Sequence, residues 1–290
     1  MLPEVKDGLS ATWKSLSCIN KWDSGTGPAI PQISFCNNFT TASLYFAFNF
    51  MYPIFLKDFR QFFSGLSGYL SIGLFLLLMG LFLFIFPETS IFDYGYATLD
   101  KFFDLAPWIM LMLVPAITMR SLSDEFRTGT WELLRTRPIS LGQVVWAKFM
   151  AAFCVGLLSL LPALLYIFTI RALSLNHSID TGGITGAFIG LILLTGIFSA
   201  IGIFSSSLTN NPIIGFLIGA FGCFLLYSVF QSISSIPGLQ GGADYWVQQI
   251  GIEAHYQSMS RGVIEWPDLV YFLGVSIIFL SATQRILKSK

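Results

Sequence analysis

Side chains able to do acid–base, nucleophilic or metal chemistry are few in this sequence and lie far apart. The two histidines, His177 and His255, fall in polar connections, where a solvated loop residue is the expected role. The four cysteines show no CxxC spacing, so we expect neither a zinc site nor a disulfide framework. The sequence also has no HExxH motif, no P-loop and no pair of carboxylates within an apolar run. We therefore expect no catalytic, metal or cofactor site on this chain.

Two ionisable residues, Asp104 and Lys148, lie close to long apolar runs. Ionisable groups within membrane spans are typical of proton relays and ion-coupled carriers. Because both residues lie near the ends of their runs, we expect them at the membrane interface, where long side chains reach water. This pattern disfavours an ion-coupled carrier, and the absence of a filter-like loop or a ring of charges gives a channel little support.

The segments that carry these residues are long and apolar. The chain is 54% hydrophobic and 11% charged, whereas soluble domains carry roughly 25% charge. This composition indicates an all-α, polytopic integral membrane protein, and a net charge of zero gives no sign of a nucleic-acid partner. Apolar runs of about 20 residues predict six transmembrane helices, at residues 69–86, 103–119, 144–170, 184–208, 213–235 and 269–283. Small side chains in the fourth span predict close helix packing, and they include Thr195, Gly196, Ser199, Gly202, Ser205, Ser206 and Ser207.

Lysine and arginine residues are unevenly distributed between the two sides of the predicted spans. One side has Lys57, Arg60, Arg120, Arg127, Arg135, Arg137, Lys148, Arg285, Lys288 and Lys290. The other side has Lys101, Arg171 and Arg261. Because an excess of Lys and Arg marks cytoplasmic loops, the sequence predicts that both termini lie in the cytoplasm.

The first fifty residues do not fit the membrane pattern. Residues 1–50 are polar, with Gly-, Pro- and Asn-containing stretches, and they end in a short aromatic run. No charged segment precedes an apolar core of signal-peptide length. We interpret residues 1–50 as an extension, either an upstream mis-called start with Met51 as the real initiator or a disordered cytoplasmic tail. Residues 51–290 are then the transmembrane domain.

Residues 52–63 combine aromatic and charged side chains at helical spacing. The aromatic residues follow the positions i, i+4, i+7 and i+8, and they are Phe55, Phe59, Phe62 and Phe63. The opposite face has Lys57, Asp58, Arg60 and Gln61. This pattern predicts an elbow helix that lies in the membrane interface and bends into the first span at Gly65 and Gly68. The alternative is a plain extension of the first span.

The connection between the second and third predicted spans, residues 120–143, is basic but also carries apolar side chains. Ser123 is predicted to cap a helix, with Asp124 and Glu125 in its first turn. Residues 130–135 are predicted to form a second short helix that ends before Pro138. Exposed apolar residues rimmed by charges predict docking on another protein or on the membrane, and here they are Phe126, Trp131, Leu133 and Leu134.

This connection resembles the signature of ABC-2 type permeases. The run that carries the resemblance is Glu125, Phe126, Arg127, Thr128, Gly129, Thr130, Trp131, Glu132, Leu133 and Leu134, followed by Arg137, Pro138, Ile139, Ser140 and Lys148. Within the family the chain is most similar to the GldF branch, the permeases of the gliding-motility ABC complex in Bacteroidetes. The segments MYPIFLKDFRQFFSGLSGYL and DEFRTGTWELLRTRPIS carry that similarity, and Trp131 replaces the Leu that is more usual in the wider family.

The resemblance implies a division of labour between chains. Two permease subunits, identical or paralogous, pack together in the inner membrane, and each rests on a cytoplasmic ATPase subunit that binds ATP and Mg²⁺. Residues 125–134 would be the coupling helix, with Phe126, Trp131, Leu133 and Leu134 as buried anchors and Arg127 and Glu132 as rim charges. Residues 236–267 would form short non-spanning helices over the substrate path.

The function expected from this resemblance is that of a permease subunit of an ABC export complex, within the gliding-motility machinery. The alternative is a six-span scaffold or assembly protein of that apparatus, without transport of its own. A membrane-embedded enzyme is disfavoured because no catalytic constellation is present. The shortage of charged residues in the spans argues against a small ionic cargo and is compatible with a lipid-linked or polymeric cargo, or with a mechanical role.

Overall fold

The computed structural model describes residues 39–86, 99–136, 139–173, 181–234 and 243–290. Within these ranges every regular element is a helix, which confirms the predicted all-α class. Residues 43–290 form one unit with its own packing, and the contacts described below all belong to it. Of the predicted extension, residues 1–38 lie outside the described residues, whereas residues 39–50 begin the first described helix, α2 (Phe39–Ser64).

Each predicted span falls on a helical segment of the structure. These segments are α3 (Leu66–Phe84), α4 (Asp100–Thr118), α7 (Leu141–Leu160) continued by α8 (Leu164–Leu173), α9 (Thr181–Leu208), α10 (Pro212–Phe224) continued by α11 (Phe230–Ser234), and α14 (Trp266–Ser289). Five segments among the described residues are long and apolar enough to cross a membrane, and a sixth is obtained when the bent pair α2–α3 is counted as one span. The protein is therefore a multi-pass membrane protein with five or six spans.

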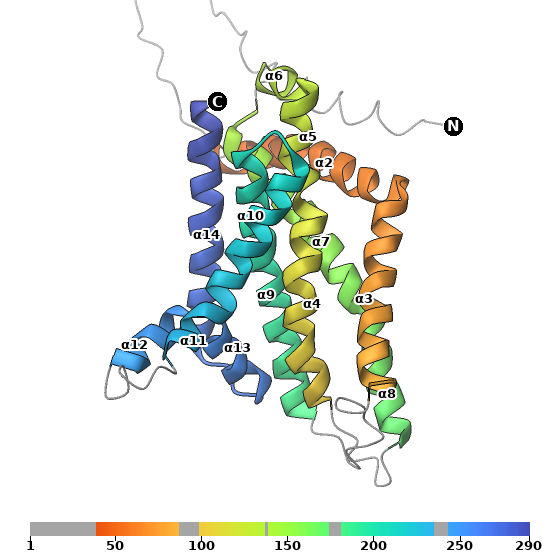
Figure 1. Ribbon diagram of the computed structural model, residues 1–290. Coiled ribbons are helices and arrows are strands. Elements are labelled where there is room, and N and C mark those ends of the chain that lie inside the picture. Colours follow the sequence, from red (N-terminus) through yellow and green to blue (C-terminus); the bar gives the residue numbers. More distant parts are fainter. Residues whose placement is uncertain (1–38, 87–98, 137–138, 174–180, 235–242) are drawn as a thin grey trace, which may run out of the picture. The chain divides into compact units, whose positions relative to one another are not determined.

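A sharp bend separates α2 from α3, as the predicted elbow requires. The two helices are bent by 66° at the break. Gly68 permits this geometry because a Cβ atom there would lie 2.8 Å from the carbonyl oxygen of Phe62. The bend is consistent with the predicted elbow, and the alternative, a frayed extension of the first span, would have to be a broken one. Figure 1 shows α2 lying across one end of the bundle.

Helix α9 is the centre of the bundle. It packs against α4, α7, α10, α13 (Ile252–Ser260) and α14, and side chains such as Leu191, Leu194 and Phe198 are fully buried on it. Its small residues bring neighbouring backbones close, because a Cβ at Gly202 would lie 2.0 Å from Thr118 Oγ1. This confirms the predicted close packing of the fourth span, which in lipid is driven by van der Waals contact rather than by hydrophobic transfer.

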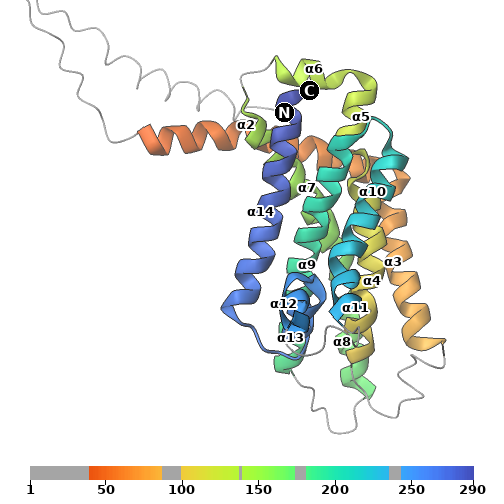
Figure 2. The ribbon, with the colours of Figure 1, turned by 60° about the vertical axis from the view of Figure 1, so that its left-hand side comes forward.

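The two ends of the bundle carry different structures. Helices α2, α5 (Arg120–Thr128) and α6 (Thr130–Arg135) lie at one end together with the C-terminus of α14 (Figures 1 and 2). Helices α11, α12 (Ala243–Ile250) and α13 lie at the other end in both views. The predicted short, non-spanning helices of residues 236–267 are therefore confirmed over residues 243–260.

Candidate functional site

The second span continues directly into the segment predicted to couple. Helix α4 ends at Thr118, α5 begins at Arg120, and α6 follows after Gly129. Gly129 has a φ of 71°, a left-handed conformation that ends a helix at little cost only for glycine. The predicted cap at Ser123 is wrong, because Ser123 lies inside α5 and its hydroxyl donates to the carbonyl of Met119. The predicted short helix at residues 130–135 is confirmed.

Four charged side chains meet between α2, α5 and α7. We call them the charge cluster, and they are Lys57, Asp58, Glu125 and Lys148. The ammonium of Lys148, on α7, donates to Asp58 Oδ2 at 3.0 Å, to Glu125 Oε1 at 2.9 Å and to the carbonyl of Ser121 at 2.7 Å. The ammonium of Lys57, on α2, donates to the same Glu125 oxygen at 2.9 Å. The cluster has two positive and two negative groups, so its net charge is zero.

The placement of Lys148 differs from the prediction. Its side chain is only 1% exposed, so it does not extend to water at the membrane interface as expected. A buried ammonium is tolerated only when its N–H groups are hydrogen-bonded and its charge is matched. An ammonium has three N–H donors, and Lys148 has three acceptors, one on α2 and two on α5. Lys148, on α7, therefore joins α2 and α5 to the third predicted span.

An apolar cluster surrounds the other side of α5 and α6. Trp131 is 6% exposed and belongs to a buried group that includes Ile54, Leu122 and Val144. The predicted exposure of Trp131 to the cytosol is therefore wrong, because its indole packs into the bundle rather than away from it. Phe126 is half-buried and lies edge-on to Trp131 at 5.6 Å between ring centroids. The ammonium of Lys290 lies 3.9 Å from the centre of the Phe126 ring, so the C-terminus of α14 contacts α5.

The remaining side chains of the predicted coupling segment face outward. Leu133 is 69% exposed, and Arg127, Thr130 and Glu132 are exposed as well. Arg127, whose side chain is exposed, lies 3.4 Å from Oδ1 of the half-buried Asp124, one helix turn away. The outer surface of α5 and α6 thus has one large exposed apolar side chain, Leu133, among charged residues. The inner side of the two helices is held by the packing of Trp131 and by the ion pair of Glu125 with Lys148.

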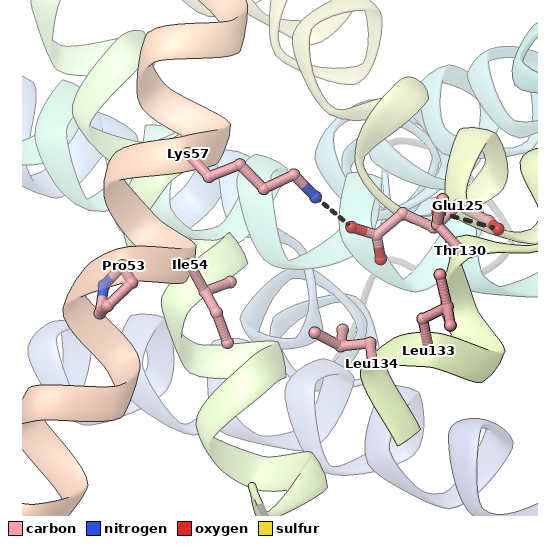
Figure 3. A pocket seen from close by; sticks show the side chains of 7 residues that line it. All are labelled: Pro53, Ile54, Lys57, Glu125, Thr130, Leu133 and Leu134. Atoms are coloured by element: carbon pink, nitrogen blue, oxygen red, sulfur yellow. Dashed lines mark hydrogen bonds and ion pairs between the residues drawn. The ribbon is translucent and has the colours of Figure 1, made fainter. Parts of the chain in front are cut away.

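A pocket of about 260 Å³ opens between the elbow helix and this segment. Figure 3 shows its lining, which is Pro53, Ile54 and Lys57 from α2, and Glu125, Thr130, Leu133 and Leu134 from α5 and α6. The second carboxylate oxygen of Glu125, Oε2, is buried and has no hydrogen-bond partner among the described residues. The pocket lining is mainly apolar, with Lys57, Glu125 and Thr130 as its polar members, so it can receive an apolar side chain.

The elbow helix has the two faces that its sequence predicts. Phe55 stacks on Phe59 with ring centroids 5.8 Å apart, and Phe59 and Phe62 each contact Phe63. Phe59, Phe62 and Phe63 pack against the main core, whereas Lys57 and Arg60 are exposed. The aromatic face therefore anchors α2 to the bundle.

The opposite end of the protein has a buried hydrogen-bonded pair that the sequence did not predict. His255 Nδ1 lies 2.6 Å from Asp268 Oδ1, and His255 Nε2 lies 3.0 Å from the carbonyl oxygen of Gln249. His255 is 6% exposed, so its predicted role as a solvated loop residue is wrong. His177 lies outside the described residues. In the part of the chain that the structure describes, no group of three or more His, Cys, Asp or Glu residues is arranged to hold a metal ion.

Comparison with known proteins gives one family. A model of the ABC-2 family transporter proteins matches residues 87–283, which is well over half of the chain. The match covers α4 to most of α14, including the coupling segment and Lys148, and it begins after the elbow helix and α3. No curated protein matches the chain.

Proposed function

The chain belongs to the ABC-2 family of transporter proteins, and we propose that it couples ATP hydrolysis on a separate ATPase subunit to export across the membrane. The family supplies the membrane component of an ABC transporter rather than its catalytic subunit. No P-loop occurs in the sequence, so ATP and Mg²⁺ would be bound by the partner. The observation that carries the coupling proposal is the buried contact of Lys148, on α7, with Glu125 on α5 and Asp58 on α2. Through this contact the segment α5–α6 is attached to both helices.

The docking surface on this chain would be the outer face of α5 and α6. Leu133 would be the buried anchor, with Arg127 and Glu132 as rim charges that fix register. Leu133 and Leu134 also line the pocket shown in Figure 3, so a side chain of the ATPase inserted there would contact α2 and α6 together. Phe126 and Trp131 would pack against the bundle and hold the segment in place, without contact to the partner.

Force applied to α6 would reach the spans by two routes. One passes through Trp131 into the apolar cluster that includes Val144 on α7. The other passes through Glu125 and Lys148 into α7 and, through Asp58, into the elbow helix. Because both contacts are packed or ion-paired, displacement of the coupling segment would move these helices as rigid bodies.

The arrangement of basic residues supports an inner-membrane protein with both termini in the cytoplasm. Arg60, Arg127, Arg135 and Lys290 lie on α2, α5, α6 and the end of α14, at one end of the bundle (Figure 1). That end would be cytoplasmic by the positive-inside rule. The elbow and α3 would then complete a six-span topology. A second permease, identical or paralogous, would cover part of the exposed apolar surface of the bundle, and lipid would cover the rest.

We further propose that the complex serves gliding motility, on the strength of the resemblance of residues 51–70 and 124–140 to that branch. Its cargo would be lipid-linked or polymeric, or its role mechanical. Deletion of the gene should abolish gliding, and a copy with Leu133→Asp should fail to restore it. Normal gliding in the deletion strain would overturn this assignment without affecting the proposed coupling to an ATPase.

Purification of the tagged full-length chain in mild detergent tests the coupling proposal. We expect an ABC ATPase to co-purify in stoichiometric amount, and Leu133→Asp to abolish its association. Val263→Asp is the matched control, because Val263 is 52% exposed and follows α13 at the other end of the protein. If an ATPase never co-purifies, the six-span scaffold becomes the better description. If both variants retain the ATPase equally, the assignment of α5 and α6 as its docking surface is wrong.

A further inference from the structure

The junction between the second span and the coupling helix contains a side chain from another helix. Ser206, on α9, is fully buried, and its hydroxyl reaches the α4–α5 junction (Thr118–Arg120). The backbone N–H groups of Leu122 and Ser123 donate to Ser206 Oγ at 3.0 and 3.1 Å. Ser206 Oγ in turn donates to the carbonyl of Met119 at 3.0 Å. The hydroxyl thus uses its donor and both of its acceptor positions on one backbone segment.

These bonds lie at Met119, the single residue that separates α4 from α5. In a continuous α-helix the N–H of Leu122 would donate to the carbonyl of Thr118, four residues earlier. Here Ser206 Oγ accepts that N–H and donates to the carbonyl of Met119, while Lys148 Nζ donates to the carbonyl of Ser121 in the first turn of α5. A side chain that enters the backbone ladder is one of the few causes of a break in a helix. The start of α5 is therefore hydrogen-bonded to both α9, through Ser206, and α7, through Lys148.

The two neighbouring serines of α9 show that this contact is specific to Ser206. Ser205 and Ser207 are as buried as Ser206. Their hydroxyls donate to carbonyls of their own helix, at Gly202 and Phe204 respectively. Of these three consecutive serines, Ser206 alone has hydrogen bonds to α5 among the described residues.

We propose that Ser206 is a positioning residue that sets the angle between the second span and the coupling helix and links that angle to α9. Two arrangements of the junction satisfy its hydrogen bonds. In one, Ser206 Oγ accepts the N–H of Leu122, as in this structure. In the other, Ser206 withdraws and the Leu122 N–H pairs with the Thr118 carbonyl, which makes α4 and α5 one continuous helix. A movement of α5 would then require a movement of α9, the central helix of the bundle.

The geometric part of this inference is tested on the permease alone, in lipid nanodiscs. Spin labels on Met112→Cys and Thr128→Cys, in a parent whose natural cysteines are replaced, report the α4–α5 angle, since both positions are exposed and neither belongs to the proposed docking surface. Ser206→Ala should shift the label distance to longer values, because the Leu122 N–H can return to Thr118. Ser205→Ala and Ser207→Ala should leave the distance unchanged, and Ser206→Thr, which keeps the hydroxyl, should restore the parent value. An unchanged distance in Ser206→Ala, or an equal shift in Ser207→Ala, overturns the proposal.

The functional part rests on the proposed coupling to an ATPase and has its own readout. In the purified complex, Ser206→Ala should keep the ATPase bound but lose the change in label distance that ATP produces in the parent. Retention of that change overturns the role of Ser206 in transmission. If no ATPase binds any variant, the proposed function fails, while the result from the permease alone still decides the geometry of the junction.

Discussion

Lys148 and Glu125 are 23 positions apart in the sequence, and their Nζ and Oε1 atoms lie 2.9 Å apart where the lysine side chain is 1% exposed. A buried ion pair contributes little net stability, because desolvation of both charges offsets their attraction. It does impose a geometry, because each charge also has a partner on α2, which is Asp58 for Lys148 and Lys57 for Glu125. The pair therefore fixes where α5 lies relative to α7.

The first prediction concerns the loss of Lys148. Lys148→Met removes the buried ammonium and leaves Asp58 and Glu125 with Lys57 as their only cation in the charge cluster. We expect a loss of about 3–5 kcal/mol, the usual result of leaving a buried charge unpaired. Lys57→Met is the control, because Lys57 is 55% exposed and such pairs are worth about 0.2–1 kcal/mol. Thermal unfolding of the full-length protein in detergent compares the two, and equal losses would contradict the assigned burial.

The second prediction distinguishes the buried Trp131, which is expected to stabilise the fold, from the exposed Leu133, which is expected to bind the ATPase. Trp131→Ala should lower the free energy of unfolding by about 3–5 kcal/mol, because it empties a packed site. Leu133→Ala removes an exposed side chain, so unfolding should change little while binding of the ATPase weakens. Thermal unfolding and quantitative co-purification measure the two effects. A stability loss for Leu133→Ala as large as that for Trp131→Ala would show that the two residues are not divided in this way.

Sequence patterns predicted the helical segments and their faces, because hydrophobic run length and helical spacing are local properties. The elbow aromatics and the small residues of α9 were found in this way. The burial of Trp131, Lys148 and His255 could not be read from the same patterns. Each depends on partners distant in sequence, such as Asp58, which is 90 positions from Lys148. One signal was present for Lys148: it follows Val144, Val145 and Ala147 in an apolar run, where a charge requires a partner.

The third prediction concerns the turn between α5 and α6. Gly129 has a φ of 71°, and its missing side chain has open space around it. Gly129→Ala should therefore destabilise through backbone strain alone, by about 1–2 kcal/mol. Gly129→Asn should cost less, because asparagine tolerates the left-handed region better. Thermal unfolding of both variants checks this order, and an equal effect of Ala and Asn would argue against strain as the cause.

The fourth prediction is a pH dependence at Glu253, on α13. Burial raises the pKa of this carboxyl above its usual value of 4.5, although a hydrogen bond from Gln257 opposes the shift. The folded protein then holds the Glu253 proton more tightly than the unfolded chain does. The contribution of Glu253 to stability is thus present below about 4.5 and is lost as pH rises through the raised value. Glu253→Gln should be more stable than the parent at neutral pH and equal to it in acid. Melting curves from pH 4 to 8 measure the difference, and a constant difference would exclude titration of this group.

The fifth prediction concerns the His255–Asp268 pair, which joins α13 to the first turn of α14. Both ring nitrogens of His255 face oxygen atoms, and Tyr271 stacks on the ring at 4.1 Å. His255→Ala would leave the buried carboxylate of Asp268 unpaired, with one oxygen that already has no hydrogen-bond partner among the described residues. We expect release of α13, seen as faster tryptic cleavage at the exposed Arg261 that follows it. His255→Ala combined with Asp268→Ala should cost less stability than the sum of the single changes, because neither buried polar group is left without its partner. Val263→Ala, in the same connection, should leave cleavage unchanged, and additive losses in the double variant would refute a coupled pair.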